Sequence, residues 1–150
     1  MAETNIRHLI AFLECARLGS FSAAAESVGR SQPAISNAIN AIESSAGVAL
    51  LRRGKSGASL TPAGEKFANR IRIAEARLRN VVIETSNCDK ARGFQVVKNL
   101  TNGQLRALSA IVDNGGFTAA ARALDIAAPS VHRAARDLER VLGVAGGAPL

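Results

Sequence analysis

The sequence contains an internal repeat, and this feature restricts the possible folds more than any other. A shift of 96 residues aligns residues 5–49 with residues 101–145 without a gap, and 13 of the 45 aligned pairs are identical. The identities include a run of three alanines, a proline and glycines at matching positions of both copies. A shared alanine-rich composition alone does not place glycines and a proline in register. We therefore interpret the two segments as copies of one structural unit.

Each copy has the apolar spacing of three helices joined by short turns. In the first copy, Ser22 is expected to cap a short second helix that runs to Val28, and Gly29 supplies the left-handed residue that stops it. Ser31 is expected to cap the third helix. Pro33 is tolerated in the first turn of that helix because the amides there have no intrahelical partner.

The third helix divides into an apolar face and a polar face. The apolar face, expected to be buried, consists of Ile35, Ala38, Ile39, Ile42 and Ala46. The polar face consists of Gln32, Ser36, Asn37, Asn40 and Ser44. The alanines at 23–25 let the second helix pack closely, and the turn at Gly29 directs the third helix outward. This pattern predicts a helix-turn-helix, whose second helix reads the DNA major groove.

A basic hairpin is predicted directly after the first copy, in the segment LLRRGKSGASLTPAGE. Two extended pieces, at 50–53 and 58–60, flank a turn at Gly54–Gly57. Arg52, Arg53 and Lys55 are expected to face a phosphate backbone, and the alternative is a solvated basic loop. The net charge of +7 favours a polyanionic partner, and residues 51–80 alone carry +6.

A long helix is predicted to begin at Thr61 and Pro62 and to run to about residue 85. Its apolar residues alternate by four and three positions, which is the spacing of a dimerisation seam. The seam consists of Phe67, Ile71, Ala74, Leu78 and Val81. A helix of some 24 residues extends about 36 Å, which is more than a small three-helix unit can cover. The seam therefore predicts dimerisation, and packing on its own domain is the alternative.

Residues 6 to about 85 resemble the N-terminal winged helix-turn-helix and linker helix of LysR-type transcriptional regulators. The resemblance rests on FLECARLGSFSAAAESVGRSQPAISNAINAIESSAG followed by LTPAGE, and the second copy resembles the same three-helix element. It implies a mainly α protein that forms a homodimer through its linker helices. It further implies sequence-specific binding to double-stranded DNA at a two-fold symmetric operator.

The resemblance also implies a set of DNA-contacting residues: Ser31, Gln32, Pro33, Ser36, Asn37, Asn40 and Arg53. With Ser22, Arg52 and Lys55 they complete the candidate DNA-binding residues of the first copy. Gln and Asn amides can bond bidentately to an adenine edge, and Ser suits phosphate. Similar proteins often carry a basic residue near positions 37 and 40. Both are Asn here, so phosphate anchoring is expected to shift to the hairpin.

The second copy keeps the fold signals but changes the exposed face of its third helix. Ala127 and Ala128 stand where the first copy has Ser31 and Gln32, which removes a cap and an amide. His132, Arg133, Arg136 and Arg140 replace Ser36, Asn37, Asn40 and Ser44. This face, with His132, Arg133 and Arg136 at its centre, is either a second DNA-binding surface or part of a packing module that no longer contacts DNA.

We therefore expect a winged helix-turn-helix over 1–61, a linker and dimerisation helix over 62–86, a linker over 87–99 and a second helix-turn-helix unit with an incomplete wing over 100–150. The LysR family normally continues into a two-lobed α/β domain that binds an inducer. Nothing in this chain alternates strands with helices in that way, so we expect no small-molecule effector site within it. The chain is either a fragment of a longer regulator or naturally short.

Other classes of function have little support in the sequence. No nucleophile stands beside a base, no paired carboxylates share a face, and Cys15 and Cys88 lack metal-ligand spacing, so we expect no enzyme, no cofactor and no metal site. No apolar run approaches the roughly 18 residues of a membrane helix, and we expect a cytoplasmic protein. The alternative function is a helical interaction module that forms mixed dimers with a full-length regulator.

Overall fold

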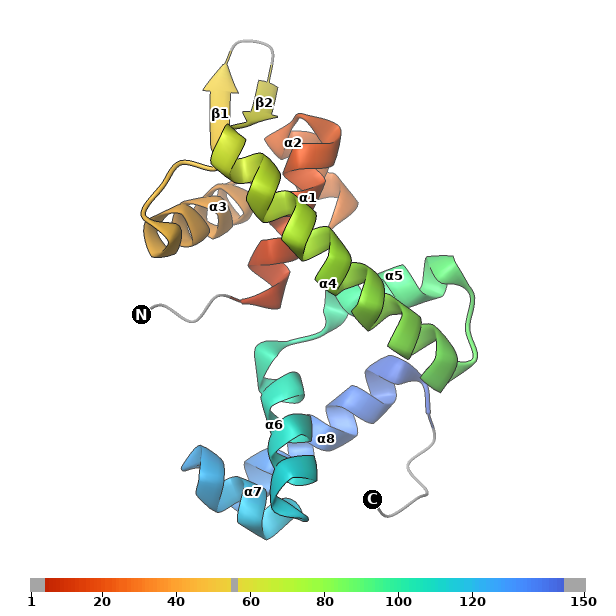
Figure 1. The fold of residues 1–150 in the computed structure, drawn as a ribbon. Coiled ribbons are helices and arrows are strands. Elements are labelled where there is room, and N and C mark those ends of the chain that lie inside the picture. Colours follow the sequence, from red (N-terminus) through yellow and green to blue (C-terminus); the bar gives the residue numbers. More distant parts are fainter. Residues whose placement is uncertain (1–4, 55–56, 145–150) are drawn as a thin grey trace. The chain divides into compact units, whose positions relative to one another are not determined.

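The computed structural model describes residues 5–54 and 57–144, and the chain divides into two compact units between Leu78 and Arg79 (Figure 1). The first unit contains α1 (Ile6–Leu18), α2 (Phe21–Ser27), α3 (Gln32–Ala46), β1 (Leu51–Gly54), β2 (Gly57–Leu60) and most of α4 (Pro62–Ser86). The second unit contains the end of α4, α5 (Lys90–Asn99), α6 (Asn102–Asn114), α7 (Phe117–Leu124) and α8 (Ala128–Leu142). The predicted mainly α fold, a winged helix-turn-helix with a long helix and a second three-helix element, is confirmed.

The helices of the first unit begin at side-chain caps. Ser31 caps α3 as predicted, because its hydroxyl accepts a hydrogen bond from the Ala34 amide at 3.4 Å. The prediction for α2 was wrong, since Ser20 and not Ser22 is the capping residue. Ser20 has the extended backbone of a cap, and its hydroxyl accepts from the Ala23 amide at 3.2 Å. Ser22 instead lies exposed in the first turn of α2.

The core of the first unit lies between α1, α2 and α3. Phe12 on α1 and Ile39 on α3 are fully buried, and the small side chains of Ala24 and Ala25 let α2 pack closely against them. Ile35, Ala38, Ile39 and Ile42 form the buried face of α3, as predicted. Ala46 was predicted to join them but is exposed, because it lies in the last turn of α3 and is followed directly by the left-handed cap at Gly47.

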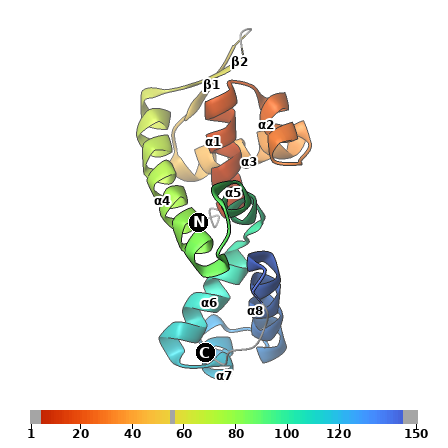
Figure 2. The same ribbon diagram turned by 90° about the vertical axis from the view of Figure 1, so that its right-hand side faces the viewer.

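The hairpin is antiparallel, with Leu51 opposite Leu60, and it docks at the carboxyl end of α1 (Figure 2). The amide of Ala58 donates to the carbonyl of Gly19 at 2.7 Å. A Cβ at Gly57 would lie 2.2 Å from the same carbonyl oxygen, so only glycine permits this approach. The hairpin is therefore seated on α1 by backbone contacts.

A second attachment joins the hairpin to α3. The Oε1 atom of Glu43 accepts hydrogen bonds from the backbone amides of Leu50 at 2.7 Å and Leu51 at 3.0 Å. Bonds to a carboxylate are stronger than bonds between neutral groups. The position of β1 is therefore tied to the helix that carries the polar face.

The segment LTPAGE attaches the start of α4 to the loop before β1. The Thr61 hydroxyl donates to the Ala49 carbonyl at 2.8 Å and accepts from the Gly64 amide at 3.0 Å. A Cβ at Gly64 would lie 2.0 Å from the Leu50 carbonyl oxygen. This helix start thus requires both a hydroxyl that caps it and a glycine that allows close contact.

The proposed dimerisation seam of α4 does not form one exposed stripe. The Phe67 ring packs edge-on against Phe12 with centroids 5.4 Å apart, and Ile71 is only 8 % exposed. These two residues belong to the core of their own unit, because the first turns of α4 cover α1. Ala74 and Val81 are exposed, and Leu78 is half-buried.

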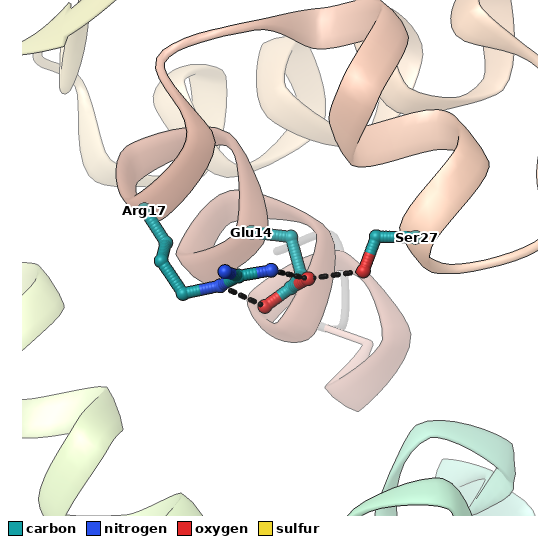
Figure 3. A network of polar contacts seen from close by, with 3 residues as sticks. All are labelled: Glu14, Arg17 and Ser27. Carbon is teal, nitrogen blue, oxygen red and sulfur yellow. Dashed lines mark hydrogen bonds and ion pairs between the residues drawn. The ribbon is translucent and has the colours of Figure 1, made fainter.

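Glu14 takes part in an ion pair within α1 and in a hydrogen bond that joins α1 to α2 (Figure 3). Glu14 is buried, and Arg17 donates to both of its carboxylate oxygens, at 3.1 and 2.9 Å. The Ser27 hydroxyl at the end of α2 donates to the same carboxylate. The hydrogen bond from Arg17 to Glu14 raises the pKa of Arg17. The equivalent positions of the second unit hold Ala110 and Ala123.

The second unit repeats the burial pattern of the first. Its buried core residues include Ala107, Ile111, Ala120, Ala121 and Val131, which align with the buried Ala11, Cys15, Ala24, Ala25 and Ile35. The turn between its second and third helices also keeps its shape. Asp125 has φ +54 where the aligned Gly29 has φ +63.

Residues 87–99, predicted as a linker, instead contain helix α5. The Asp89 carboxylate caps it by accepting from the Arg92 amide at 2.8 Å. Val96 and Val97 are buried, which supplies the apolar contact that a linker would lack. A Cβ at Gly93 would lie 2.7 Å from the side chain of Ile83, so this glycine allows α5 to pack closely on the end of α4.

Candidate nucleic-acid interface

The polar face of α3 is presented as the sequence predicts. Gln32, Asn37 and Asn40 are exposed, and Ser36 is half-buried. The buried residues of α3 hold this face outward, and none of these four side chains carries a charge. Such a surface offers hydrogen-bond donors and acceptors without strong attraction to any one anion.

Arg53 lies across this face. Its Nη1 atom donates to Ser36 Oγ at 3.3 Å, and its Nη2 atom donates to Asn40 Oδ1 at 3.0 Å. Its guanidinium carbon also lies 4.6 Å from the centre of the Phe21 ring. The sequence suggested that Arg53 faces the phosphate backbone beside the groove. The structure shows its guanidinium bonded to α3, where it adds positive charge to the polar face, and contact with phosphate stays a prediction.

The other described candidates of the first unit lie on α2, at the start of α3 and on β1. Ser31 and Pro33 are exposed at the start of α3. Ser22 is exposed on α2 and Arg52 on β1, where Arg52 and Arg53 point to opposite sides because side chains alternate along a strand. Lys55 lies outside the described residues.

Cys15 is buried beneath this surface. Burial raises the pKa of its thiol to about 11, although the positive charge of Arg53 acts in the opposite direction. The thiol is therefore neutral near pH 7, and its position in the core makes it inert. Cys15 and Cys88 are both free, as the sequence predicts.

The equivalent surface of the second unit lies on α8. Ala127 makes no side-chain bond at the start of this helix, which confirms the predicted loss of the cap. His132, Arg133, Arg136 and Arg140 are all exposed. The His132 ring stacks on Phe117, with centroids 4.1 Å apart and planes 4° from parallel. His132 thus covers the phenylalanine that aligns with Phe21.

The two phenylalanines are part of the site, and sequence reasoning did not include them. The guanidinium of Arg53 lies over the Phe21 ring, and the His132 ring stacks on the Phe117 ring. Their identity in the two copies was the available signal. Helical periodicity gave them no role, because each stands at the first position of a short helix.

Comparison with known proteins identifies the fold and its family. A family model for the bacterial regulatory helix-turn-helix protein, lysR family, matches residues 6–65 and 103–145. The chain belongs to this family. Both three-helix units therefore match the LysR helix-turn-helix, and the first match includes the hairpin and the start of α4.

The curated LysR relatives are transcription regulators. The chain is 41 % identical over 80 residues to the HTH-type transcriptional regulator TdcA of Escherichia coli K12, which is 53 % of this chain and 26 % of the relative. It is 39 % identical over 82 residues to a probable hydrogen peroxide-inducible genes activator of Streptomyces viridosporus, covering 55 % and 26 %. The chain thus spans about a quarter of the length of the relatives it matches.

Solved LysR structures share the fold over a similar part of the chain. The BenM DNA-binding domain in complex with catB site 1 DNA has a TM-score of 0.52 and 29 % identity, covering 55 % of this chain and 91 % of that one. The Corynebacterium glutamicum OxyR C206S mutant has a TM-score of 0.53 and 27 % identity, covering 56 % and 27 %.

The residues that the structure describes contain neither a cluster of metal ligands nor a membrane-spanning helix. Within residues 5–54 and 57–144, no three His, Cys, Asp or Glu side chains are grouped so that they could hold a metal ion. No helix in the same ranges is long and apolar enough to cross a membrane.

Proposed function

We propose that the chain is a sequence-specific DNA-binding regulator of transcription, and that α3 of the first unit reads the base sequence. The observation that carries this proposal is the exposed, uncharged face of Gln32, Asn37 and Asn40, with the guanidinium of Arg53 held on it. Membership of the LysR family supports it, as does the likeness to the BenM domain in its DNA complex.

The chemistry of this face suits base edges in the major groove. An Asn or Gln amide can donate to adenine N7 or accept from its amino group, and both bonds can form at once. Arg53 brings a planar guanidinium with several donors to the same surface. Arg52, on the other side of β1, is free of these contacts and suits a phosphate of the backbone.

We further propose that the chain acts as a homodimer on a two-fold symmetric operator, with α4 as the pairing helix. Ile73 is 49 % exposed and Val81 is 58 % exposed, and Ala74 lies beside Ile73. Residues 73 and 81 are about two helical turns apart, so their side chains lie on one side of α4. We therefore assign the pairing contact to this stripe. Phe67 and Ile71 are not part of it, because they hold α4 against its own unit.

The reading of bases can be tested with a duplex selected from a randomised pool. Gln32→Ala and Asn37→Ala should each lower discrimination between the selected and a mixed-sequence duplex by about 1 to 3 kcal/mol. Ser44→Ala, also exposed on α3 but two turns farther along, is the matched control. Full discrimination by both amide variants would refute the assignment of α3.

The dimer can be tested separately. Ile73→Glu with Val81→Glu should shift the chain from dimer to monomer in sedimentation equilibrium, because like charges would meet across the helix pair. Arg72→Glu with Arg77→Glu, at exposed positions of the same helix, controls for the added negative charge. A dimer that survives the first pair of changes would exclude the Ile73 and Val81 stripe as the contact.

The same stripe favours a second candidate function, in which the chain forms mixed dimers with a full-length LysR regulator. The chain spans about a quarter of the length of the relatives it matches. In this role, inhibition of the longer partner would depend on Ile73 and Val81 and would survive Gln32→Ala. Inhibition that is lost with Gln32→Ala would instead favour direct competition for DNA.

A further inference from the structure

The exposed face of α8 differs in charge from the face of α3 with which it aligns. The residues of this face, called the α8 cationic face below, are His132, Arg133, Arg136 and Arg140. The aligned residues of α3 are Ser36, Asn37, Asn40 and Ser44. Four uncharged residues of one helix are thus replaced by three arginines and a histidine in the other.

The arginines of the α8 cationic face are available for an anion. Arg133 and Arg136 are exposed, and no carboxylate of residues 5–54 or 57–144 lies within ion-pair distance of either. Arg136 donates only a long bond of 3.4 Å to the carbonyl of His132, which leaves its charge uncompensated. Arg140 pairs with Asp137 at 3.0 Å, yet its side chain remains 78 % exposed.

Buried side chains on the opposite side of α8 hold this helix in place. Val131 and Leu138 are buried on the opposite side of α8. His132 is fixed by its stack on Phe117, so the face is joined to the start of α7. The arginines therefore project from a fixed helix and do not lie on a loop, which reduces the entropy lost when they bind.

The start of α8 lacks the groups that read bases. In a helix-turn-helix, the first residues of the reading helix contact base edges. Here these residues are Ala127, Ala128 and Pro129, whose side chains have no donor or acceptor. Arg133 and Arg136 lie about one to two and a half turns farther along, at the positions that align with Asn37 and Asn40. They replace the amides of those residues with guanidinium groups, whose geometry matches that of phosphate oxygens.

We propose that the α8 cationic face binds the phosphate backbone of duplex DNA without reading its base sequence. The second unit then supplies a contact whose strength comes from neutralised phosphates and released counterions. This site is separate from α3 and does not depend on how α3 recognises its operator.

The experiment compares the whole chain with Arg133→Ala plus Arg136→Ala and with a control, Arg72→Ala plus Arg77→Ala. Both pairs remove two exposed arginines from a helix and lower the net charge equally. Affinity for a mixed-sequence duplex is measured by fluorescence anisotropy from 50 to 200 mM salt. Circular dichroism checks that both variants keep their helix content.

The α8 variant should flatten the plot of log affinity against log salt by about 1.8, because each lost phosphate contact removes about 0.9. The parent chain should then lose about tenfold more affinity than this variant between the two salt concentrations. The control should keep the parent slope. Equal slopes in all three chains, or equal flattening in both variants, would overturn the proposal, since the second result reports net charge alone.

A duplex selected by the parent chain adds a further measurement. The ratio of its affinity to that of the mixed duplex should be the same in the α8 variant, as expected for contacts to the backbone. A lower ratio would overturn sequence-independent binding, because it would mean that the arginines read guanine. If α3 does not read bases, no duplex will be selected from the randomised pool. The salt slopes on the mixed-sequence duplex can still be measured in that case, so the two proposals fail separately.

Discussion

Arg53 and Phe21 bring the hairpin and the start of α2 together, since the guanidinium carbon of Arg53 lies 4.6 Å from the centre of the Phe21 ring. The same guanidinium donates to Ser36 and Asn40, so three elements meet at one cation. In the second unit, His132 on Phe117 takes the equivalent place. Both units have a phenylalanine at this position. The side chain that lies on it is Arg53 in the first unit and His132 in the second, so the two surfaces differ in chemistry.

The shape of Arg53 should therefore matter as well as its charge. Arg53→Lys keeps the charge but loses the planar group that bonds Ser36 and Asn40 together. We expect affinity for a selected duplex to fall about tenfold, or about 1.4 kcal/mol, with little change in salt slope. Arg52→Lys is the matched control in titrations by fluorescence anisotropy. Equal affinity of both variants would contradict the role of the Arg53 contacts.

Gly64 should tolerate no side chain. A Cβ there would lie 2.0 Å from the Leu50 carbonyl oxygen, which is backbone and cannot move aside cheaply. Gly64→Ala should lower the free energy of unfolding by about 3 kcal/mol, measured by urea denaturation. Gly54→Ala is the control, because nothing lies within 4 Å of a Cβ at that position. Similar stability of both variants would mean that α4 does not begin against Leu50.

The Glu14 network should show strong coupling. Ser27→Ala removes a donor from a buried carboxylate, and Glu14→Ala removes the carboxylate itself. Each should cost about 1 to 3 kcal/mol of unfolding free energy. The double variant recreates the alanine pair found at 110 and 123, and it should cost at least about 1 kcal/mol less than the sum of the single changes. Additive costs in urea denaturation would show that the two residues act independently.

Cys15 should make stability depend on pH in the alkaline range. The folded thiol has its pKa raised from 9.0 to about 11, so folding favours the protonated form. Its contribution is fully present below pH 9 and is lost as the pH rises toward 11. We expect the free energy of unfolding to fall by up to about 1.4 kcal/mol per pH unit more in the parent than in Cys15→Ala. Parallel urea profiles of the two chains at pH 8, 9 and 10 would disprove this.

The elements that sequence predicts well are those set by local chemistry. Ser31 caps α3 because its hydroxyl reaches the Ala34 amide, and Thr61 with Pro62 marks the start of α4. The polar face of Gln32, Asn37 and Asn40 follows from helical periodicity once α3 is placed. These signals lie within a few residues of one another, so no tertiary information is needed to interpret them.

The features missed from sequence depend on contacts between distant segments. Arg53 is separated from Phe21 by more than thirty positions, and periodicity does not relate a strand to a helix in this way. Ile71 follows the spacing of a dimer seam, but the same spacing serves a helix that packs on its own unit. At the end of α5, the spacing of Val96, Val97 and the C-cap residue Leu100 was a helical signal that the surrounding polar residues obscured.

The hydrogen bonds that Glu43 accepts from the amides of Leu50 and Leu51 restrict the shape of the DNA that can be bound. Because one carboxylate of α3 holds two successive amides, the angle between helix and hairpin is set before any duplex arrives. A groove whose width or curvature does not match that angle can engage α3 or the hairpin, but not both at full contact. Duplex stiffness at base pairs that no side chain touches would then enter the choice of binding site.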